Sequence, residues 1–266
     1  MEIGFGAVDD TWGKYGLEQR HIRIDGRDTS YKAIFRDGRL VRVLGSDYYL
    51  FPNEEALRVA DTAAEMAGLS PFSVPAPGLK SMNHVLYNRE ETRMRALYSL
   101  GRVHRVDGDE VNLAVSVFNA IDGTSSFGCG LFTYRRICGN GVIMGRENLV
   151  SVSRIHTKGL QAAIEGLKAR MVQVMEEGVG ILDSYRRMAQ QKVTDRLVDK
   201  ILTSRLPLRV LPDYLREEEA RLPDISEWTL YNDITERIWH SAKTDLQTKT
   251  FQFNTLHGIL LPPRRL

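Results

Sequence analysis

Residues 118–141 read FNAIDGTSSFGCGLFTYRRICGNG and contain the turn on which the predicted fold depends. Asp122-Gly123 predicts a tight turn between two strands, because this dipeptide readily takes the positive φ angles of hairpin turns. The preceding strand alternates between two sets of positions, as a half-buried strand does. One set is Val111, Leu113, Val115 and Val117, and the other is Asn112, Ala114, Ser116 and Phe118. The next strand is expected at 127–138, where glycines permit a bend or a close backbone approach.

The same turn signal recurs upstream. Asp107-Gly108 joins an expected strand at 93–106 to one at 109–119, so three antiparallel strands follow one another. Two further Asp-Gly steps divide residues 20–50 into an expected β-meander. These steps are Asp25-Gly26 and Asp37-Gly38.

Helices are expected once in the first half and throughout the second. Residues 53–67 carry apolar side chains at helical spacing, with Asn53 as the expected N-cap, and a proline-rich loop follows at 69–80. From Thr157 to Val193 apolar residues recur every three or four positions. This spacing predicts one long amphipathic helix or two in line, with a kink or break near Gly178 and Gly180.

The remaining signals complete an α+β fold. Thr194 and Ser226 are expected to begin further helices, and the apolar tail is expected to dock on the body or on another subunit. The prediction is an antiparallel sheet with a β-β-β-α core in the first half and a helical C-terminal part. Residues 1–156 form the β-rich region with one helix near 53–67, and residues 157–266 form a mostly helical region packed on it as one continuous domain.

Composition narrows the class of protein. The formal net charge is +2, no apolar run approaches the ~20 residues that cross a bilayer, and the first residues lack a signal-peptide pattern. We therefore expect a cytoplasmic protein without a membrane partner. Cys129 and Cys138 are the only cysteines, too few for a disulfide scaffold, and are expected to be buried thiols.

No motif for catalysis or for a cofactor is present. The chain lacks a P-loop and a dinucleotide fingerprint, and we expect no cofactor. The two cysteines with His156 do not make the four close ligands of structural zinc, and no nucleophile motif accompanies His104 or His156. Asp122 could hold a divalent ion, but no second carboxylate lies at a recognisable spacing, and turn chemistry explains it better.

Arginines on the expected strands are the strongest functional signal. Lys and Arg outnumber acids seven to three between Arg20 and Arg42, six to two between Lys80 and Val106, and seven to two between Thr133 and Arg170. Guanidinium groups neutralise phosphates and aromatic rings stack on bases, a combination typical of single-strand binding. The candidate phosphate ligands are Arg93, Arg95, Arg102, Arg105, Arg135 and Arg136, and the candidate stacking residues are Tyr98 and Tyr134. Strict alternation places Arg102 opposite Arg93, Arg95 and Arg105, and ordinary solvent-facing strand residues explain the pattern equally well.

Three segments resemble one known family. AIFRDGRLVRVLGSDYYLFPNEEA (33–56), the stretch 118–141 and SRIHTKGLQAA (153–163) resemble the phage- and plasmid-like family called domain of unknown function 932. The resemblance covers roughly Tyr31 to Ala163, and its motif positions are Asn119, Asp122, Gly123, Arg136, Cys138 and Asn140. It implies a mobile-element setting and no established activity. The β-β-β-α order is also similar to that of single-strand annealing proteins, which assemble into rings or filaments with a basic groove.

The leading hypothesis is therefore a nucleic-acid-binding protein of a virus, plasmid or prophage. It is expected to hold single-stranded DNA along the arginine-bearing strands and to promote annealing in recombination as an oligomer. One alternative is a self-assembling structural protein, in which a basic body meets the acidic helical end of a neighbour. The other is a metal-dependent nuclease that uses Asp122.

Overall fold

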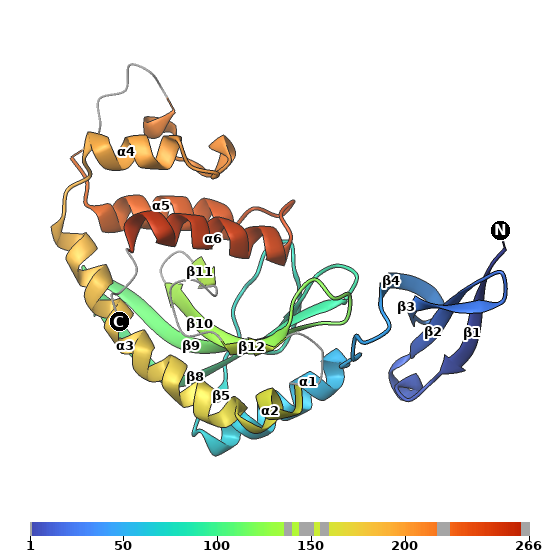
Figure 1. Cartoon of the computed structure of the whole chain (residues 1–266). Coiled ribbons are helices and arrows are strands. Elements are labelled where there is room, and N and C mark those ends of the chain that lie inside the picture. The colour runs from blue at the N-terminus through green and yellow to red at the C-terminus, as the bar shows by residue number, and fades with distance from the viewer. Residues whose placement is uncertain (1, 136–139, 144–151, 155–159, 217–223, 262–266) are drawn as a thin grey trace.

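The computed structural model describes residues 2–135, 140–143, 152–154, 160–216 and 224–261, and its strands form two antiparallel sheets (Figure 1). The four-stranded small sheet has the order β1-β2-β3-β4. Its strands are β1 (Ile3–Asp9), β2 (Leu17–Ile24), β3 (Arg27–Arg36) and β4 (Arg39–Gly45). A short 3-10 helix, η1 (Gly13–Tyr15), precedes β2. The small sheet stands to one side of the rest of the chain (Figure 1).

The large sheet is built around a meander of three long strands. These are β8 (Arg93–Val106), β9 (Asp109–Ala120) and β10 (Phe127–Arg135), close to the predicted ranges. The sheet order is β11-β10-β9-β8-β7-β6, and β12 pairs with β10 while β5 pairs with β8. The short strands are β5 (Ser70–Pro71), β6 (Lys80–Met82), β7 (Val85–Tyr87), β11 (Asn140–Ile143) and β12 (Val152–Arg154). Two short strands thus separate the meander from the next helix, so the simple β-β-β-α order is incomplete.

Helices cover both faces of the large sheet (Figure 1). α1 (Asn53–Met66), α2 (Leu160–Glu165) and α3 (Leu167–Gln190) lie along one face, and α5 (Glu227–Trp239) and α6 (Leu246–Leu260) lie along the other. α4 (Asp195–Leu202), η2 (Leu208–Val210) and η3 (Asp213–Leu215) connect α3 to α5. The predicted α+β class is confirmed, and none of the helices described is long and apolar enough to cross a membrane.

Several local expectations are settled by hydrogen bonds at helix ends. Thr194 and Ser226 cap α4 and α5, since each side chain accepts a bond from a backbone N–H three residues on. Asn53 does not cap α1, because Pro52 occupies the N-cap position and Asn53 is the first helical residue. The helix does not break at Gly178: α3 runs on through it, and the helical row is divided at Gly166 instead.

Close packing explains the glycine within α3. A Cβ atom at Gly178 would lie 2.8 Å from Cδ1 of Leu131, which is fully buried in β10. Gly178 therefore lets the helix approach the sheet closely. This packing offsets the cost of ~1 kcal/mol that a glycine has in a helix relative to alanine. The apolar tail docks on its own chain, because Phe253, Leu256 and Leu260 of α6 are buried in the main core.

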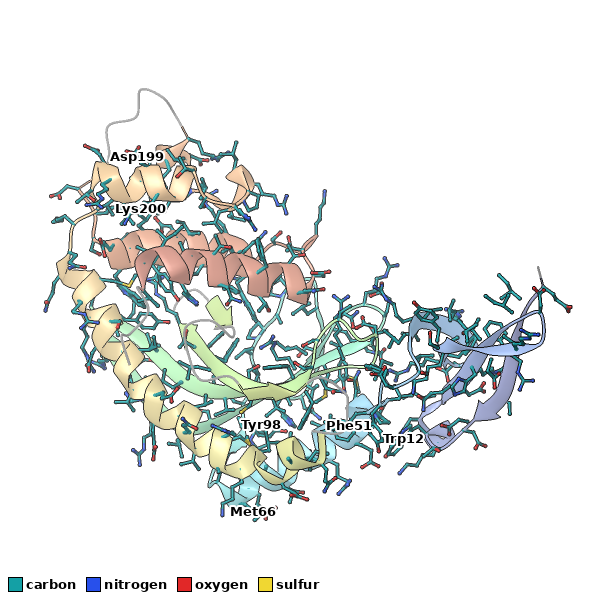
Figure 2. All side chains as sticks on the ribbon, in the orientation of Figure 1. Trp12, Phe51, Met66, Tyr98, Asp199 and Lys200 are labelled. Atoms are coloured by element: carbon teal, nitrogen blue, oxygen red, sulfur yellow. The ribbon has the colours of Figure 1, made fainter. Side chains whose placement is uncertain are left out.

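The two sheets have separate cores that meet at a narrow junction. Leu17 and Ile34 of the small sheet pack with Leu50 and Ile121 in a minor cluster. Trp12 borders this cluster, and Phe51 belongs to the main core on the other side of the junction (Figure 2). The small sheet is thus attached through one face only.

Candidate functional site

The family-motif residue Asp122 anchors the loop between β9 and β10. Its carboxylate is almost fully buried and accepts bonds from Arg93 Nε at 2.9 Å, Thr92 Oγ1 at 3.0 Å and the Thr124 backbone N–H at 3.0 Å. The Thr124 hydroxyl also bonds to it. These donors, one of them a guanidinium, occupy the carboxylate, which suits a structural anchor better than a cation site.

Asp122-Gly123 differs from the other Asp-Gly steps in backbone conformation. Asp25, Asp37 and Asp107 all have φ near +50°, and the glycine after each also has a positive φ, as type I′ turns require. Among the residues with positive φ, Gly123 appears but Asp122 does not. The predicted turn is present, but its aspartate serves as a hydrogen-bond acceptor in a longer loop.

The neighbouring motif positions join separate parts of the chain. Asn119 Nδ2 donates to the Phe51 carbonyl and to Asn53 Oδ1, both at 2.9 Å, which ties β9 to the start of α1. A Cβ atom at Gly123 would lie 2.7 Å from Leu44 of the small sheet. These described motif residues therefore hold the junction between the two sheets. Arg136 and Cys138 lie outside the described residues, and only the backbone of Asn140 is described, in β11.

The structure does not bring the described candidate arginines together on one surface. Arg93 is paired with Asp122 and lies 3.7 Å from Asp245, and Arg135 is paired with Asp109 at 2.8 Å. Asp109 also accepts a bond from Trp228 Nε1 at 2.9 Å, so the second pair links the sheet to α5. Both arginines make structural ion pairs at partly buried positions.

The two candidate tyrosines are not equally open. Tyr98 is fully buried, and its hydroxyl donates to Asp61 at 2.8 Å; burial first, and then this bond, raise its pKa. A base cannot stack on a ring that is covered on both sides, so Tyr98 does not fit the stacking role expected for it. Tyr134 is partly exposed and makes an edge contact with Phe72 at 5.9 Å.

Arg95 is buried beneath α6. It is 8% exposed, and its guanidinium donates to Ser116 Oγ at 2.8 Å and to Thr250 Oγ1 at 3.4 Å. Burial lowers its pKa to about 10, so it stays charged at neutral pH. It is therefore inaccessible to a polymeric strand running across the outside of the protein.

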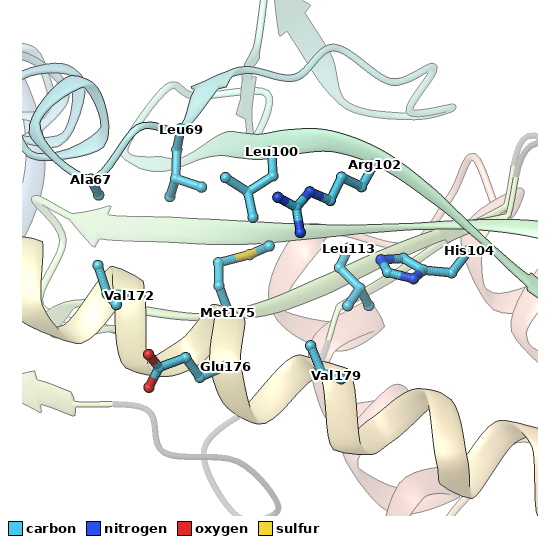
Figure 3. A pocket seen from close by; sticks show the side chains of 10 residues that line it. All are labelled: Ala67, Leu69, Leu100, Arg102, His104, Leu113, Val172, Met175, Glu176 and Val179. Carbon is cyan, nitrogen blue, oxygen red and sulfur yellow. The ribbon is translucent and has the colours of Figure 1, made fainter.

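Arg102 and Arg105 are the exposed members of the described candidate set. Neither makes an ion pair within 4.0 Å among the residues that the structure describes. Arg102 is at the rim of a groove of about 210 Å³ between β8 and α3, which we call the β8–α3 groove (Figure 3). Its lining is Ala67, Leu69, Leu100, Arg102, His104, Leu113, Val172, Met175, Glu176 and Val179.

Two arginines, Arg102 and Arg186, lie near His104 of this groove. Partial burial, followed by the nearby charges of Arg186 and Arg102, lowers the pKa of His104. Arg186 comes from α3 and pairs with Asp183 at 2.7 Å at the surface, while Glu176 supplies one opposing charge in the lining. Sequence reasoning missed Arg186 and the groove, because only the packing of α3 on β8 brings them to Arg102.

The cysteine that is described behaves as predicted. Cys129 is a free, fully buried thiol in β10, and burial raises its pKa to about 12, so it is unreactive at neutral pH. Within the described ranges no group of three or more His, Cys, Asp or Glu side chains is placed to hold a metal ion.

One face of the small sheet, the open face, is uncovered and largely apolar, with the paired side chains of Arg20 and Glu18 among its apolar residues. The pairing register places Phe5 opposite Ile22, Val43 opposite Ala33, and Leu40 opposite Phe35 on this face. Phe5 and Phe35 contact each other edge to face at 5.4 Å. Exposed large apolar side chains on the open face are Ile3, Phe5, Val8, Ile24, Tyr31, Leu40 and Val43.

The fold and these sites define an α+β protein in which a helix-covered antiparallel sheet carries a smaller, half-covered sheet. Residues 41–257 match the family described as domain of unknown function DUF932. The match covers most of the chain, so the protein belongs to this family. Comparisons with curated proteins and with solved structures gave no match.

Proposed function

We propose that this protein binds single-stranded nucleic acid, with DNA as the first candidate, at the β8–α3 groove. The observation that carries the proposal is the exposure of Arg102, without a carboxylate partner among the described residues, at the rim of an apolar groove. Such cations attract phosphates of any sequence, and the association releases condensed counterions. The proposed binding surface is therefore smaller than the six-arginine surface expected from the sequence.

The groove lining suits the remaining part of a nucleotide. Leu100, Val172 and Val179 are exposed apolar side chains, and Met175 lies between the strand and the helix (Figure 3). An apolar floor bordered by cations accepts the faces of unstacked bases while the phosphates remain at the rim. Duplex DNA hides its base faces, so the proposed preference is for single strands.

Salt-dependent binding tests the proposal. Fluorescence anisotropy with a labelled single-stranded oligonucleotide is expected to show an affinity that falls as salt rises. Arg102→Gln is expected to weaken binding to all sequences and to reduce the slope of log K against log salt by about 1. Arg209→Gln is the matched control, because Arg209 is exposed on η2 and lies outside the groove lining. Equal effects of the two variants, or no binding by wild type at low salt, would refute the proposal.

Annealing in recombination, in a mobile-element setting, is the biological role proposed for this binding. A fluorescence-quenching assay with complementary labelled strands is the direct measurement. The expected result is annealing faster than the spontaneous rate and slowed by Arg102→Gln. Spontaneous rates despite tight binding would leave strand protection as the role and would contradict annealing.

Self-association is the second candidate function, and the open face favours it. Tyr31 is 55% exposed and Leu40 is 57% exposed on a face that no described element covers. An uncovered apolar sheet face is typical of a protein interface. Assembly through the apolar tail is not favoured, because α6 is buried in its own chain.

Light scattering tests the second candidate. If two open faces pair, wild type is expected to be dimeric or larger, and Leu40→Lys with Val43→Lys is expected to be monomeric. The paired control is Leu202→Lys with Leu208→Lys, which changes two exposed side chains in the α4–η2 region. A monomeric wild type at all concentrations would contradict self-association and leave the groove proposal untouched.

A further inference from the structure

A second pocket, on the face of the large sheet beneath α6, contains a buried positive charge. It has a volume of about 250 Å³ and lies between the sheet and α6, away from the β8–α3 groove. We call it the Arg95 pocket, because Arg95 lines it together with Arg93, Phe118 and Asn119 from the sheet. Thr124 and Ser125 from the β9–β10 loop also line it, and α6 contributes Gln247, Thr250, Phe251 and Asn254.

Arg95 differs from the other inward-facing arginines in its partners. Arg93, two residues away on the same strand, has carboxylates from Asp122 and Asp245, and Arg135 has Asp109. The guanidinium of Arg95 has hydroxyl partners and the ring of Phe118 at 5.3 Å, and no carboxylate of a described residue lies within 4.0 Å. A charged group buried without a counter-charge is costly, so an anion is expected to accompany it.

The unused donors of Arg95 fit an oxyanion. Nη1 donates to Ser116, whereas among the described residues Nε has no hydrogen-bond partner and Nη2 makes only the 3.4 Å contact with Thr250. Nε and Nη2 share one edge of the guanidinium, the edge that binds the two oxygens of a carboxylate or phosphate in parallel. This edge therefore retains the donors for a bidentate anion.

The rest of the lining restricts the kind of anion. Asn119 lines the pocket from β9, but its side chain is turned to the start of α1 on the other face of the sheet. Hydroxyl and amide groups of Thr124, Ser125 and Gln247 add polar contacts, while Phe118 and Phe251 supply apolar surface. A small organic molecule with one oxyanion, a polar group and an apolar part matches this lining.

We propose that the Arg95 pocket binds a small organic oxyanion, a carboxylate or a phosphate monoester, whose charge is neutralised by Arg95. The site is independent of the β8–α3 groove, because Arg95 and Arg102 point to opposite faces of the sheet and line different pockets. α6 forms one wall of the pocket. Binding is therefore expected to stabilise the docking of α6 on the sheet.

Inorganic phosphate and acetate are the probes for the test, each titrated into full-length protein at constant ionic strength with chloride. The midpoint of thermal unfolding of wild type is expected to rise with one or both probes, because they bind only the folded state. A rise with phosphate alone assigns the phosphate class, and a rise with acetate alone assigns the carboxylate class. No rise with either probe overturns the proposal.

Variants separate this site from general anion effects. Arg95→Met is expected to raise the Kd of the effective probe at least about 30-fold, as loss of charged hydrogen bonds does. Arg102→Gln is expected to leave that Kd unchanged. If the probe raises the midpoint of thermal unfolding of Arg95→Met as much as that of wild type, Arg95 has a purely structural role and the proposal is overturned.

A surface variant keeps the test decisive if Arg95→Met does not fold. Phe251 is 47% exposed at the pocket, so Phe251→Asp adds a competing carboxylate without removing core packing. Leu208→Asp is the matched control, since Leu208 is 64% exposed on η2. The probe effect is expected to be lost in Phe251→Asp and kept in Leu208→Asp, and its retention in both overturns the proposal.

Discussion

Replacing Asp122 by asparagine tests the assignment of this motif residue to loop anchoring. The substitution keeps the size of the side chain and removes its charge. Two obligate donors face the carboxylate, Arg93 Nε–H on one oxygen and the Thr124 backbone N–H on the other. Whichever way the new amide is oriented, its NH₂ group meets one of these donors, so at least one buried hydrogen bond is lost.

The expected cost follows from the contacts that are broken. A charge-assisted bond is worth about 1.5–3 kcal/mol, and removing one partner of a buried ion pair costs about 3–5 kcal/mol. Asp245, 3.7 Å from Arg93, compensates part of the loss. We therefore expect the free energy of unfolding to fall by about 3 kcal/mol. For a chain of 266 residues this corresponds to a Tm about 5 °C lower.

Equilibrium urea unfolding of wild type and variant measures this difference directly. Asp107→Asn is the matched control, because it changes the same residue in another Asp-Gly step. Asp107 has φ +47°, which asparagine accepts, and its side chain is exposed, so a change below about 0.5 kcal/mol is expected. Equal stabilities of Asp122→Asn and Asp107→Asn would refute the anchoring role. Mg²⁺-dependent cleavage of DNA that Asp122→Asn abolishes without loss of stability would favour the nuclease alternative.

Three further predictions concern buried groups. Burial lowers the pKa of His257 to about 3, so as pH falls below about 6.5 this imidazole is protonated in the unfolded chain but not in the folded one. The free energy of unfolding, measured with urea, should therefore fall by up to ~1.4 kcal/mol per pH unit as the pH is lowered. The variant His257→Gln should reduce this slope. A slope unaltered in His257→Gln would contradict this. Gly178→Val should lower the free energy of unfolding by about 1–3 kcal/mol, because its side chain meets Leu131; a gain in stability would show that α3 has room there. Lys249→Met should lower the free energy of unfolding by about 2–3 kcal/mol, because Lys249 Nζ donates to the carbonyls of Pro77 and Trp239. An unchanged urea midpoint would show that these hydrogen bonds do not stabilise the fold.

Local signals in the sequence predicted the central meander well. Asp107-Gly108 predicted its hairpin because two positive φ angles are a property of the dipeptide itself. Asp122-Gly123 has the same two residue types but another conformation, since Thr92 and Arg93, at the start of β8, bond to the aspartate across a long sequence separation. The same dipeptide thus takes different conformations when residues distant in sequence form hydrogen bonds with it.

The candidate site was harder to predict because an arginine's role depends on what lies opposite it. Arg93, Arg95 and Arg102 share one strand, yet the structure assigns them an ion pair, a buried pocket and an exposed rim. Alternation along the strand correctly separated Arg102 from Arg95. The helices that cover the two faces decide which of them meets solvent, and their docking is not a property of the strand sequence.

The open face illustrates a signal that was present but unused. Residues 31–36 alternate between Tyr31, Ala33 and Phe35 on one side and Lys32, Ile34 and Arg36 on the other. Apolar residues on both sides predict a strand with two contact surfaces. The structure covers the Ile34 side, while Tyr31 stays exposed.

Photocrosslinking tests the proposed location of nucleic acid most directly. A single-stranded oligonucleotide containing 4-thiothymidine is irradiated with the full-length protein, and the crosslinked peptides are identified by mass spectrometry. Binding at the β8–α3 groove predicts crosslinks within residues 100–104 of β8 and 172–179 of α3, lost on addition of unlabelled strand. Crosslinks confined to the small sheet, or none under conditions of saturated binding, would contradict the central claim.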